Sequence, residues 1–224
     1  MKSIKQLLEP YKHFYILSYY LVILALYNIY NEITVPKYFM YCKLDDYIPF
    51  VKEMIVPYLF WYLYIAGALI YLGFTARKDF YNLACFMFTG MTLCFVIFAI
   101  FPNGQNLRPV IKESDIFSRA VQYIYMVDNP TNSAPSMHVL NAIAVHLALT
   151  KCATLAGKVW LKVGSFITMV LIIMSTVMLK QHSILDAMYG VLLSILLYFI
   201  IYKIDIISYF TSTRAFDKKK EMFE

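Results

Sequence analysis

The sequence predicts an all-α membrane protein, a polytopic bundle of about six transmembrane helices. Of its 224 residues, 61% are apolar and 15% are charged, whereas soluble domains average about 45–50% apolar and about 25% charged residues. A water-soluble core of this length cannot bury such a surplus of apolar side chains, so we expect lipid to cover it. The apolar runs are continuous rather than alternating, which favours helices over the strands of a barrel.

Six apolar stretches approach the roughly 20 residues that a helix needs to cross the hydrocarbon layer. The fourth is short unless its helix begins in the polar segment before it. A shorter amphipathic helix is expected over residues 116–126, inside a long loop between residues 102 and 135. We treat residues 1–224 as a single domain. The predicted spans cover residues 14–30, 55–74, 81–101, 137–150, 159–179 and 184–202.

The basic residues predict how the bundle is oriented. If the loops alternate between two sides, most of the 20 Lys and Arg residues share a side with both termini. The positive-inside rule places that side in the cytoplasm. We therefore expect a multi-pass protein of the cell membrane with cytoplasmic termini and a charged cytoplasmic tail over residues 217–224. Because the basic residues flank apolar runs, the net charge of +6 does not predict nucleic acid binding. The oligomeric state stays open.

Three polar segments adjoin spans on the same predicted outer side, over residues 102–109, 129–138 and 180–186. Ionisable residues at facing ends of membrane helices are candidates for function. In the third segment, His182 and Asp186 are four residues apart and share a helix face. A carboxylate there would fix the imidazole tautomer and leave the other ring nitrogen free as a nucleophile or base.

The second polar segment predicts the start of a helix. Pro135 suits the first helical turn, and Asn132 or Ser133 would cap it. The free backbone N–H groups of such a helix start form an anion site. Ser136 would add a hydroxyl group to this site, and His138 a titratable imidazole.

Arg108 in the first polar segment carries a planar guanidinium group that suits phosphate. Taken singly, such an arginine is more often structural, and a histidine at a helix start is often only a solvated side chain. The four cysteines form no CxxC or Cys/His cluster, so we expect no metal and no other cofactor.

Together these residues resemble the type 2 phosphatidic acid phosphatase superfamily, whose signature has three blocks. The second block reads Pro-Ser-x-His and is matched in full by Pro135, Ser136 and His138. The third block is matched at the right spacing by Ser175, His182 and Asp186. The blocks occur in the family's order, and the motif-bearing part covers residues 101–190.

The first block and one position of the third depart from the family pattern. Arg108 and Pro109 match the end of the first block, but Phe101 stands where the family has a lysine. Thr176 stands where the third block has an arginine. Two cationic phosphate ligands of the family are therefore missing, and the nearby Lys180 is a candidate to replace one of them.

The resemblance implies a metal-independent membrane phosphatase that acts on a lipid phosphate or lipid pyrophosphate. His182 would attack phosphorus and form a phosphohistidine, with Asp186 orienting it. His138 would protonate the leaving oxygen and then activate water or a second alcohol. The expected phosphate ligands are Arg108, Ser136, Lys180 and Ser175.

Two alternatives remain open at this point. Because a phosphodiester carries less negative charge than a phosphomonoester, the missing cations favour a headgroup transferase or phospholipase. Such an enzyme would resemble the inositol phosphorylceramide and sphingomyelin synthases. The alternative of another class is a non-catalytic transporter or scaffold, in which the buried histidines and Asp186 serve as relay or binding groups.

Overall fold

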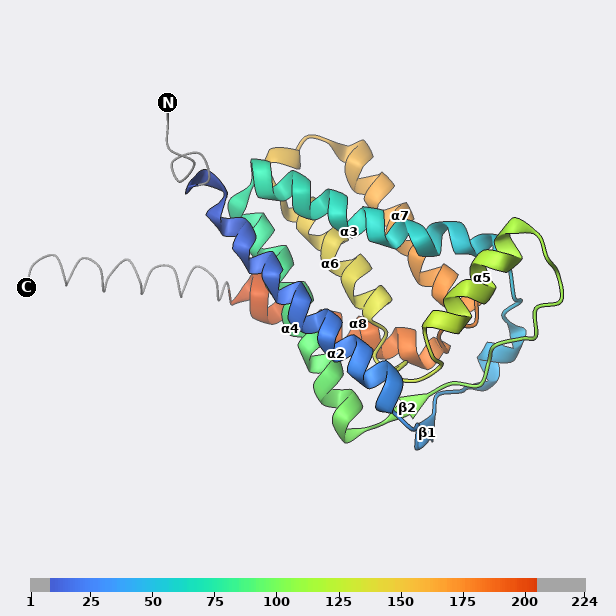
Figure 1. The fold of residues 1–224 in the computed structure, drawn as a ribbon. Helices are drawn as coiled ribbons and strands as arrows, with labels where there is room; N and C mark the ends of the chain where they lie inside the picture. The colour runs from blue at the N-terminus through green and yellow to red at the C-terminus, as the bar shows by residue number, and fades with distance from the viewer. Residues whose placement is uncertain (1–8, 205–224) are drawn as a thin grey trace, which may run out of the picture.

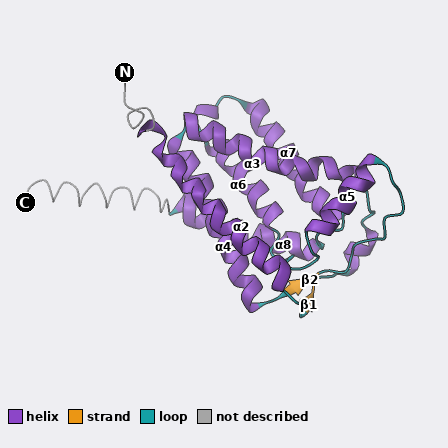
Figure 2. Ribbon diagram, in the orientation of Figure 1, coloured by secondary structure: helices purple, strands orange, loops and turns teal. Residues whose placement is uncertain are grey.

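The computed structural model describes residues 9–204, and the predicted tail over 217–224 lies outside them. The described chain is mostly helical, with one pair of two-residue parallel strands (Figure 2). In chain order the elements are η1 (Glu9–Ser18), α2 (Tyr19–Ile33), β1 (Tyr38–Phe39), η2 (Lys43–Tyr47), η3 (Lys52–Met54), α3 (Ile55–Thr75), α4 (Arg77–Ile100), β2 (Asn103–Gly104), α5 (Ile116–Val127), α6 (Met137–Lys151), η4 (Ala153–Leu155), α7 (Val159–Met178), α8 (Ile184–Tyr198) and η5 (Phe199–Lys203).

Five of the six predicted spans are helices long and apolar enough to cross a membrane. The sixth, α6, has 15 residues, which makes it about 22 Å long at 1.5 Å per residue. That is shorter than the roughly 30 Å hydrocarbon layer, so a sixth crossing stays a prediction. The five candidate spans are Glu9–Ile33, Lys52–Thr75, Arg77–Ile100, Val159–Met178 and Ile184–Lys203.

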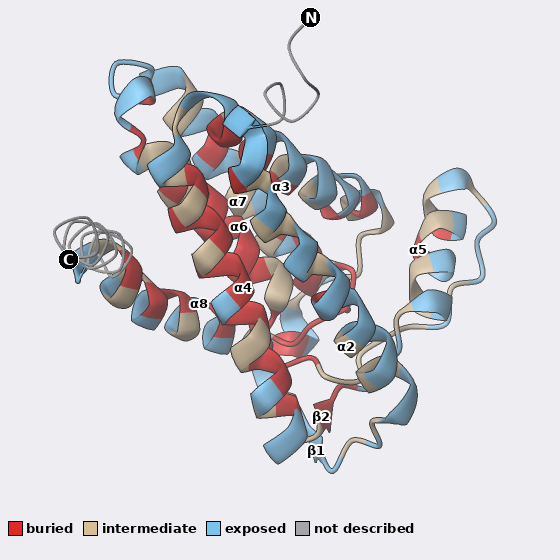
Figure 3. Cartoon of the chain, turned by 60° about the vertical axis from the view of Figure 1, so that its left-hand side comes forward, coloured by how far each residue is buried: buried red, intermediate tan, exposed pale blue. Residues whose placement is uncertain are grey.

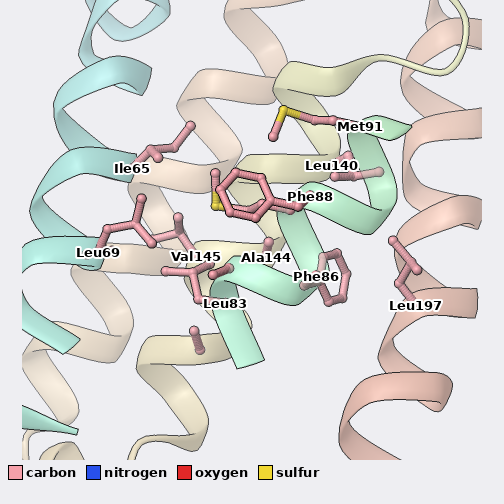
Figure 4. Close-up of a cluster of buried hydrophobic side chains, with 14 of the residues drawn as sticks. Ile65, Leu69, Leu83, Phe86, Phe88, Met91, Leu140, Ala144, Val145 and Leu197 are labelled. Atoms are coloured by element: carbon pink, nitrogen blue, oxygen red, sulfur yellow. The ribbon is translucent and has the colours of Figure 1, made fainter. Parts of the chain in front are cut away.

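Helix α6 forms the centre of the bundle, where it packs against α3, α4, α7 and α8. Its residues Leu140, Ala144 and Val145 are completely buried, and they belong to the largest apolar cluster (Figure 4). Phe86 and Leu83 of α4 are also completely buried there. Because other helices surround α6, it is held in place by protein on most sides.

Helix α2 shows the opposite pattern, since it lies on the outside of the bundle and packs mainly on α4 (Figure 3). Of its 15 residues, Ile23 is the one that is buried. Leu21 and Leu24 are exposed by 70% and 53%. Apolar side chains presented outward along a whole helix indicate a surface that lipid covers.

The predicted amphipathic helix is confirmed as α5. Asp115 caps it by accepting hydrogen bonds from the backbone N–H groups of Phe117 and Ser118, at 3.0 and 3.2 Å. Lys52 in η3, directly before α3, forms an ion pair with Asp115 at 2.7 Å. The described chain begins and ends at one end of the bundle, while α5, β1 and β2 lie at the opposite end (Figure 1).

The start of α6 corrects one expectation. The helix begins at Met137, and the residue that caps it is Ser136, whose Oγ accepts a hydrogen bond from Val139 N at 3.4 Å. Pro135 therefore precedes the helix instead of occupying its first turn, and neither Asn132 nor Ser133 is the cap. The hydroxyl of Ser136 satisfies an N–H group that the helix itself leaves free.

Candidate active site

His182 and Asp186 come together as their spacing predicts. His182 Nδ1 lies 3.2 Å from Asp186 Oδ2, and the backbone N–H of Ser183 donates to the same oxygen at 2.9 Å. Asp186 is completely buried. Because an ionised carboxylate only accepts hydrogen bonds, Nδ1 carries the proton and the lone pair is on Nε2. In this tautomer Nε2 of His182 is free to accept a proton or to form a new bond.

A second carboxylate, Asp45, fixes the turn that carries His182. Asp45 lies in the segment between α2 and α3 and is 1% exposed. Ser183 Oγ donates to its Oδ2 at 2.6 Å, and Ile184 N donates to its Oδ1 at 2.8 Å. The start of α8 is therefore held by a residue that is distant in sequence.

His138 faces His182 from the first turn of α6. The centroids of the two imidazole rings are 5.6 Å apart. The ring of His138 lies between those of Tyr58 and Trp61 of α3, at centroid distances of 4.7 and 4.5 Å. Its Nε2 is buried and has no hydrogen-bond partner within the described residues. The aromatic neighbours hold the ring while leaving one nitrogen available.

The approach of α6 and α8 depends on Gly190. A Cβ atom at this position would lie 2.9 Å from the carbonyl oxygen of Ser136 and 3.1 Å from Cβ of Val139. Ser136 N also donates to the carbonyl oxygen of Asp186 at 3.1 Å. These contacts bring the helix starts that carry His138 and His182 together.

We therefore predict that Gly190→Ala lowers activity by about tenfold or more, because its methyl group forces α6 away from α8 and misplaces His138 relative to His182. Gly164→Ala in α7 is the matched control, since a Cβ atom there meets nothing within 4 Å. Initial rates and thermal unfolding of the two detergent-purified variants provide the measurement. Equal activity of the two variants would contradict this role for Gly190.

Arg108 is held at the same end of the bundle by three contacts. Its Nη1 donates to the carbonyl oxygen of Tyr125 at 3.1 Å, and its Nη2 donates to Gln181 Oε1 at 2.5 Å. Its guanidinium carbon lies 4.6 Å from the centroid of the Tyr125 ring. Its Nε is buried without a hydrogen-bond partner in the described part of the chain. Burial lowers the pKa of Arg108, which nonetheless stays far above neutrality.

A cavity of about 450 Å³ joins Arg108, His138 and His182. One wall is polar and comes from the loop between α5 and α6. The other wall is apolar and comes from α2, α3 and α4. Of the described residues that line this cavity, Arg108 is the one lysine or arginine. The apolar wall includes Tyr20, Ile23, Leu24, Ile65, Met91, Phe95 and Phe98.

The structure places three other predicted phosphate ligands outside the cavity lining. Lys180 Nζ donates to the backbone carbonyl oxygens of Asp45 and Ile48, at 2.7 and 2.6 Å. Ser175 Oγ donates to the carbonyl oxygen of Ile172 at 2.6 Å within α7. Ser136 caps α6. In this geometry all three support the helices and loops around the site.

The two positions that depart from the family pattern also lie away from the cavity lining. The ring of Phe101 stacks on that of Tyr38, with centroids 4.1 Å apart. Thr176 Oγ1 donates to the carbonyl oxygen of Ile173 at 2.8 Å. Neither side chain supplies a charge, so the guanidinium group of Arg108 carries the cationic part of the site.

Two histidines, a carboxylate and an arginine gathered at one end of a bundle of apolar helices mark a candidate functional site. A family model described as PAP2 superfamily matches residues 85–207, which is more than half of the chain. The chain therefore belongs to the PAP2 superfamily, and the resemblance predicted from the motifs is confirmed. No curated protein and no solved structure gives a significant match to the chain.

Proposed function

We propose that the chain transfers phosphoryl groups of membrane lipids without a metal, through a phosphohistidine at His182. The observation that carries the proposal is the hydrogen bond from His182 Nδ1 to the buried Asp186, with the ring of His138 facing His182. This pairing supplies an oriented nucleophile and a second titratable group beside it.

In the first step, His182 Nε2 forms a bond to phosphorus and the bond from phosphorus to the leaving oxygen breaks. The electron pair goes to that oxygen, and protonated His138 donates a proton to it. Positive charge that develops on the His182 ring is balanced by Asp186. Arg108 stabilises the non-bridging oxygens, where charge gathers in the transition state.

In the second step, neutral His138 removes a proton from water or from an acceptor alcohol. The oxygen of this acceptor bonds to phosphorus, and the bond from phosphorus to His182 Nε2 breaks, which returns the electron pair to the ring. Water yields hydrolysis, whereas an alcohol yields transfer. Each histidine ends the cycle in the protonation state in which it began.

The apolar wall of the cavity supports a lipid as the substrate, since acyl chains could lie against α2, α3 and α4 while the phosphate meets Arg108. We place the cavity on the outer face of the cell membrane, with both termini in the cytoplasm. The distribution of Lys and Arg supports this orientation. So does the position of α5, β1 and β2 at the end of the bundle away from the ends of the described chain (Figure 1).

One observation favours phosphodiesters over phosphomonoesters. Arg108 is the one lysine or arginine among the described residues that line the cavity. A phosphomonoester dianion or a pyrophosphate needs more positive charge than a single guanidinium group supplies in a partly buried site. A phosphodiester monoanion matches that charge, so transfer or hydrolysis of a phospholipid headgroup is the form of the reaction that this geometry supports best.

The purified protein in mixed micelles tests this choice. We expect headgroup release or exchange on phosphodiester lipids to exceed phosphate release from phosphatidic acid or undecaprenyl pyrophosphate by about tenfold or more. A tenfold rate difference needs only about 1.4 kcal/mol, which one uncompensated negative charge on the substrate can readily supply. The His182→Ala protein provides the blank. Faster phosphate release from phosphatidic acid would make the chain a phosphomonoesterase. Absence of every reaction would favour a non-catalytic role.

A further inference from the structure

Asp128 is an acidic residue in the polar wall of the cavity that the reaction above does not use. It directly follows α5, and its Oδ1 accepts a hydrogen bond from the hydroxyl of Tyr27 at 2.8 Å. No described residue donates a hydrogen bond to its side-chain Oδ2. A carboxylate beside a phosphate site is unfavourable for an anionic substrate, so its presence there needs a reason.

The carboxyl group of Asp128 has no ion-pair partner among the described residues, within which its side chain contacts the hydroxyl of Tyr27. The nearest candidate, Arg108, donates its Nη1 and Nη2 to Tyr125 and Gln181 and forms no ion pair with Asp128 among the described residues. Burial raises the pKa of Asp128 and outweighs the Tyr27 hydrogen bond and the neighbouring Arg108 and His182, which lower it. A cation that enters the cavity would lower this pKa and favour the ionised carboxylate.

Tyrosine side chains line the same cavity as Asp128. Tyr27, Tyr58 and Tyr62 line it together with Asp128, and Tyr62 is 55% exposed. The faces of aromatic rings attract ammonium groups, and choline-type cations in particular. A cavity lined by a carboxyl group and several tyrosine rings is therefore chemically suited to an ammonium group.

The amide side chains of Asn129 and Asn132 hold the loop between α5 and α6 in place. Asn129 Nδ2 donates to the carbonyl oxygen of Asn31 at 2.8 Å, and Asn129 N donates to Asn31 Oδ1 at 2.9 Å. Asn132 Nδ2 donates to the carbonyl oxygen of Tyr30 at 3.0 Å. These bonds fix the loop against the end of α2, so the amide groups that a polyol headgroup would need are largely occupied.

We infer that Asp128, with Tyr27 and Tyr62, binds the ammonium group of a zwitterionic phosphodiester lipid, one with a choline or ethanolamine headgroup. This inference rests on the proposed phosphoryl transfer at His182 and names its substrate class. The phosphate would lie between Arg108 and His182, with the ammonium group towards the loop and the acyl chains along the apolar wall.

This placement also defines which bond breaks. His182 Nε2 bonds to phosphorus, and the bond from phosphorus to the lipid's alcohol oxygen breaks. The electron pair passes to that oxygen, and protonated His138 in the first turn of α6 donates a proton to it. The phosphorylated headgroup stays on His182 with its ammonium group at Asp128, until water or an acceptor alcohol removes it.

The test measures binding separately from turnover. His182→Ala protein in a non-ionic detergent is titrated by calorimetry with dihexanoyl phosphatidylcholine, phosphatidylethanolamine, phosphatidylglycerol and phosphatidic acid. We expect the two ammonium lipids to bind at least about tenfold more tightly than the other two. Adding Asp128→Asn, which keeps an acceptor for Tyr27, should remove this preference.

The matched control is Asp46→Asn in the same background, because Asp46 is exposed and also accepts a tyrosine hydrogen bond, from Tyr41 at 2.6 Å. It should keep the full preference. If Asp128→Asn does not fold, Tyr62→Leu serves instead, and it should weaken choline binding by about threefold or more. Equal binding of all four lipids, or a preference that survives in Asp128→Asn, overturns the inference. A preference for ammonium lipids without turnover by the unmodified protein would instead remove the proposed function.

Discussion

Replacement of His182 by Ala is expected to reduce turnover by at least about 10⁴-fold, because the variant lacks the atom that bonds to phosphorus. Asp186→Asn keeps the shape of the carboxylate but no longer fixes the tautomer or balances the charge of His182. By analogy with other histidines oriented by a carboxylate, we expect a loss of about 10²- to 10⁴-fold in this variant. The two losses should not be additive, since the two residues act as a unit.

The sharper measurement is chemical trapping of the intermediate. A substrate labelled in its phosphate group is mixed with enzyme, the reaction is quenched, and acid-labile, alkali-stable label on the protein is counted. His182→Ala should carry no such label. His146→Ala is the control, because His146 lies on the same helix as His138 but bonds to Ser165 Oγ at 3.1 Å. Label that persists in the His182→Ala protein would assign the nucleophile to another residue.

The sequence predicts the helices well because lipid imposes a simple rule on them. An apolar run near 20 residues long has to be helical to satisfy its own backbone in a bilayer. Helix α6 departs from this rule. Other helices surround it instead of lipid, so it can be shorter than the bilayer is thick. The error at Pro135 has a different origin. Several residues in that segment could cap a helix, and the choice of Ser136 depends on the contact with Asp186 of α8.

The site itself was predictable where its contacts are local. His182 and Asp186 meet because four residues make about one helical turn, and the motif spacing identifies His138. Asp45 and Gln181 were not found, because their contacts with Ser183 and Arg108 join segments far apart in the chain. Asp45 lies between Lys43 and Asp46 in the sequence, so no local pattern distinguished it from an ordinary exposed acidic residue.

Lys180 shows the limit of judging charge from sequence. It lies two residues from His182 and was therefore a natural phosphate ligand. Its ammonium group instead meets two backbone carbonyl oxygens in the segment before α3, which the sequence does not bring near it. Asp128 is the complementary case, since the fold places this loop residue in the cavity lining, and no motif in the sequence marks it.

Replacement of His138 by Gln should separate the two steps of the reaction. On a lipid ester, whose leaving oxygen needs a proton, we expect turnover to fall by about 10²- to 10⁴-fold. On a p-nitrophenyl phosphodiester the leaving group departs as a stable anion, so the first step should continue. The second step still needs a base to activate water. The variant should therefore release one equivalent of nitrophenolate per enzyme and then stall.

The same trapping measurement then gives opposite results for the two histidines. With the nitrophenyl substrate, His138→Gln should accumulate labelled phosphohistidine, whereas His182→Ala should form none. His146→Gln serves as the control and should show neither the burst nor the stall. Equal losses on both substrates without a burst would mean that His138 does not transfer the proton. His138, whose Nε2 has no hydrogen-bond partner among residues 9–204, would then contribute to the site only through its packing against Tyr58 and Trp61.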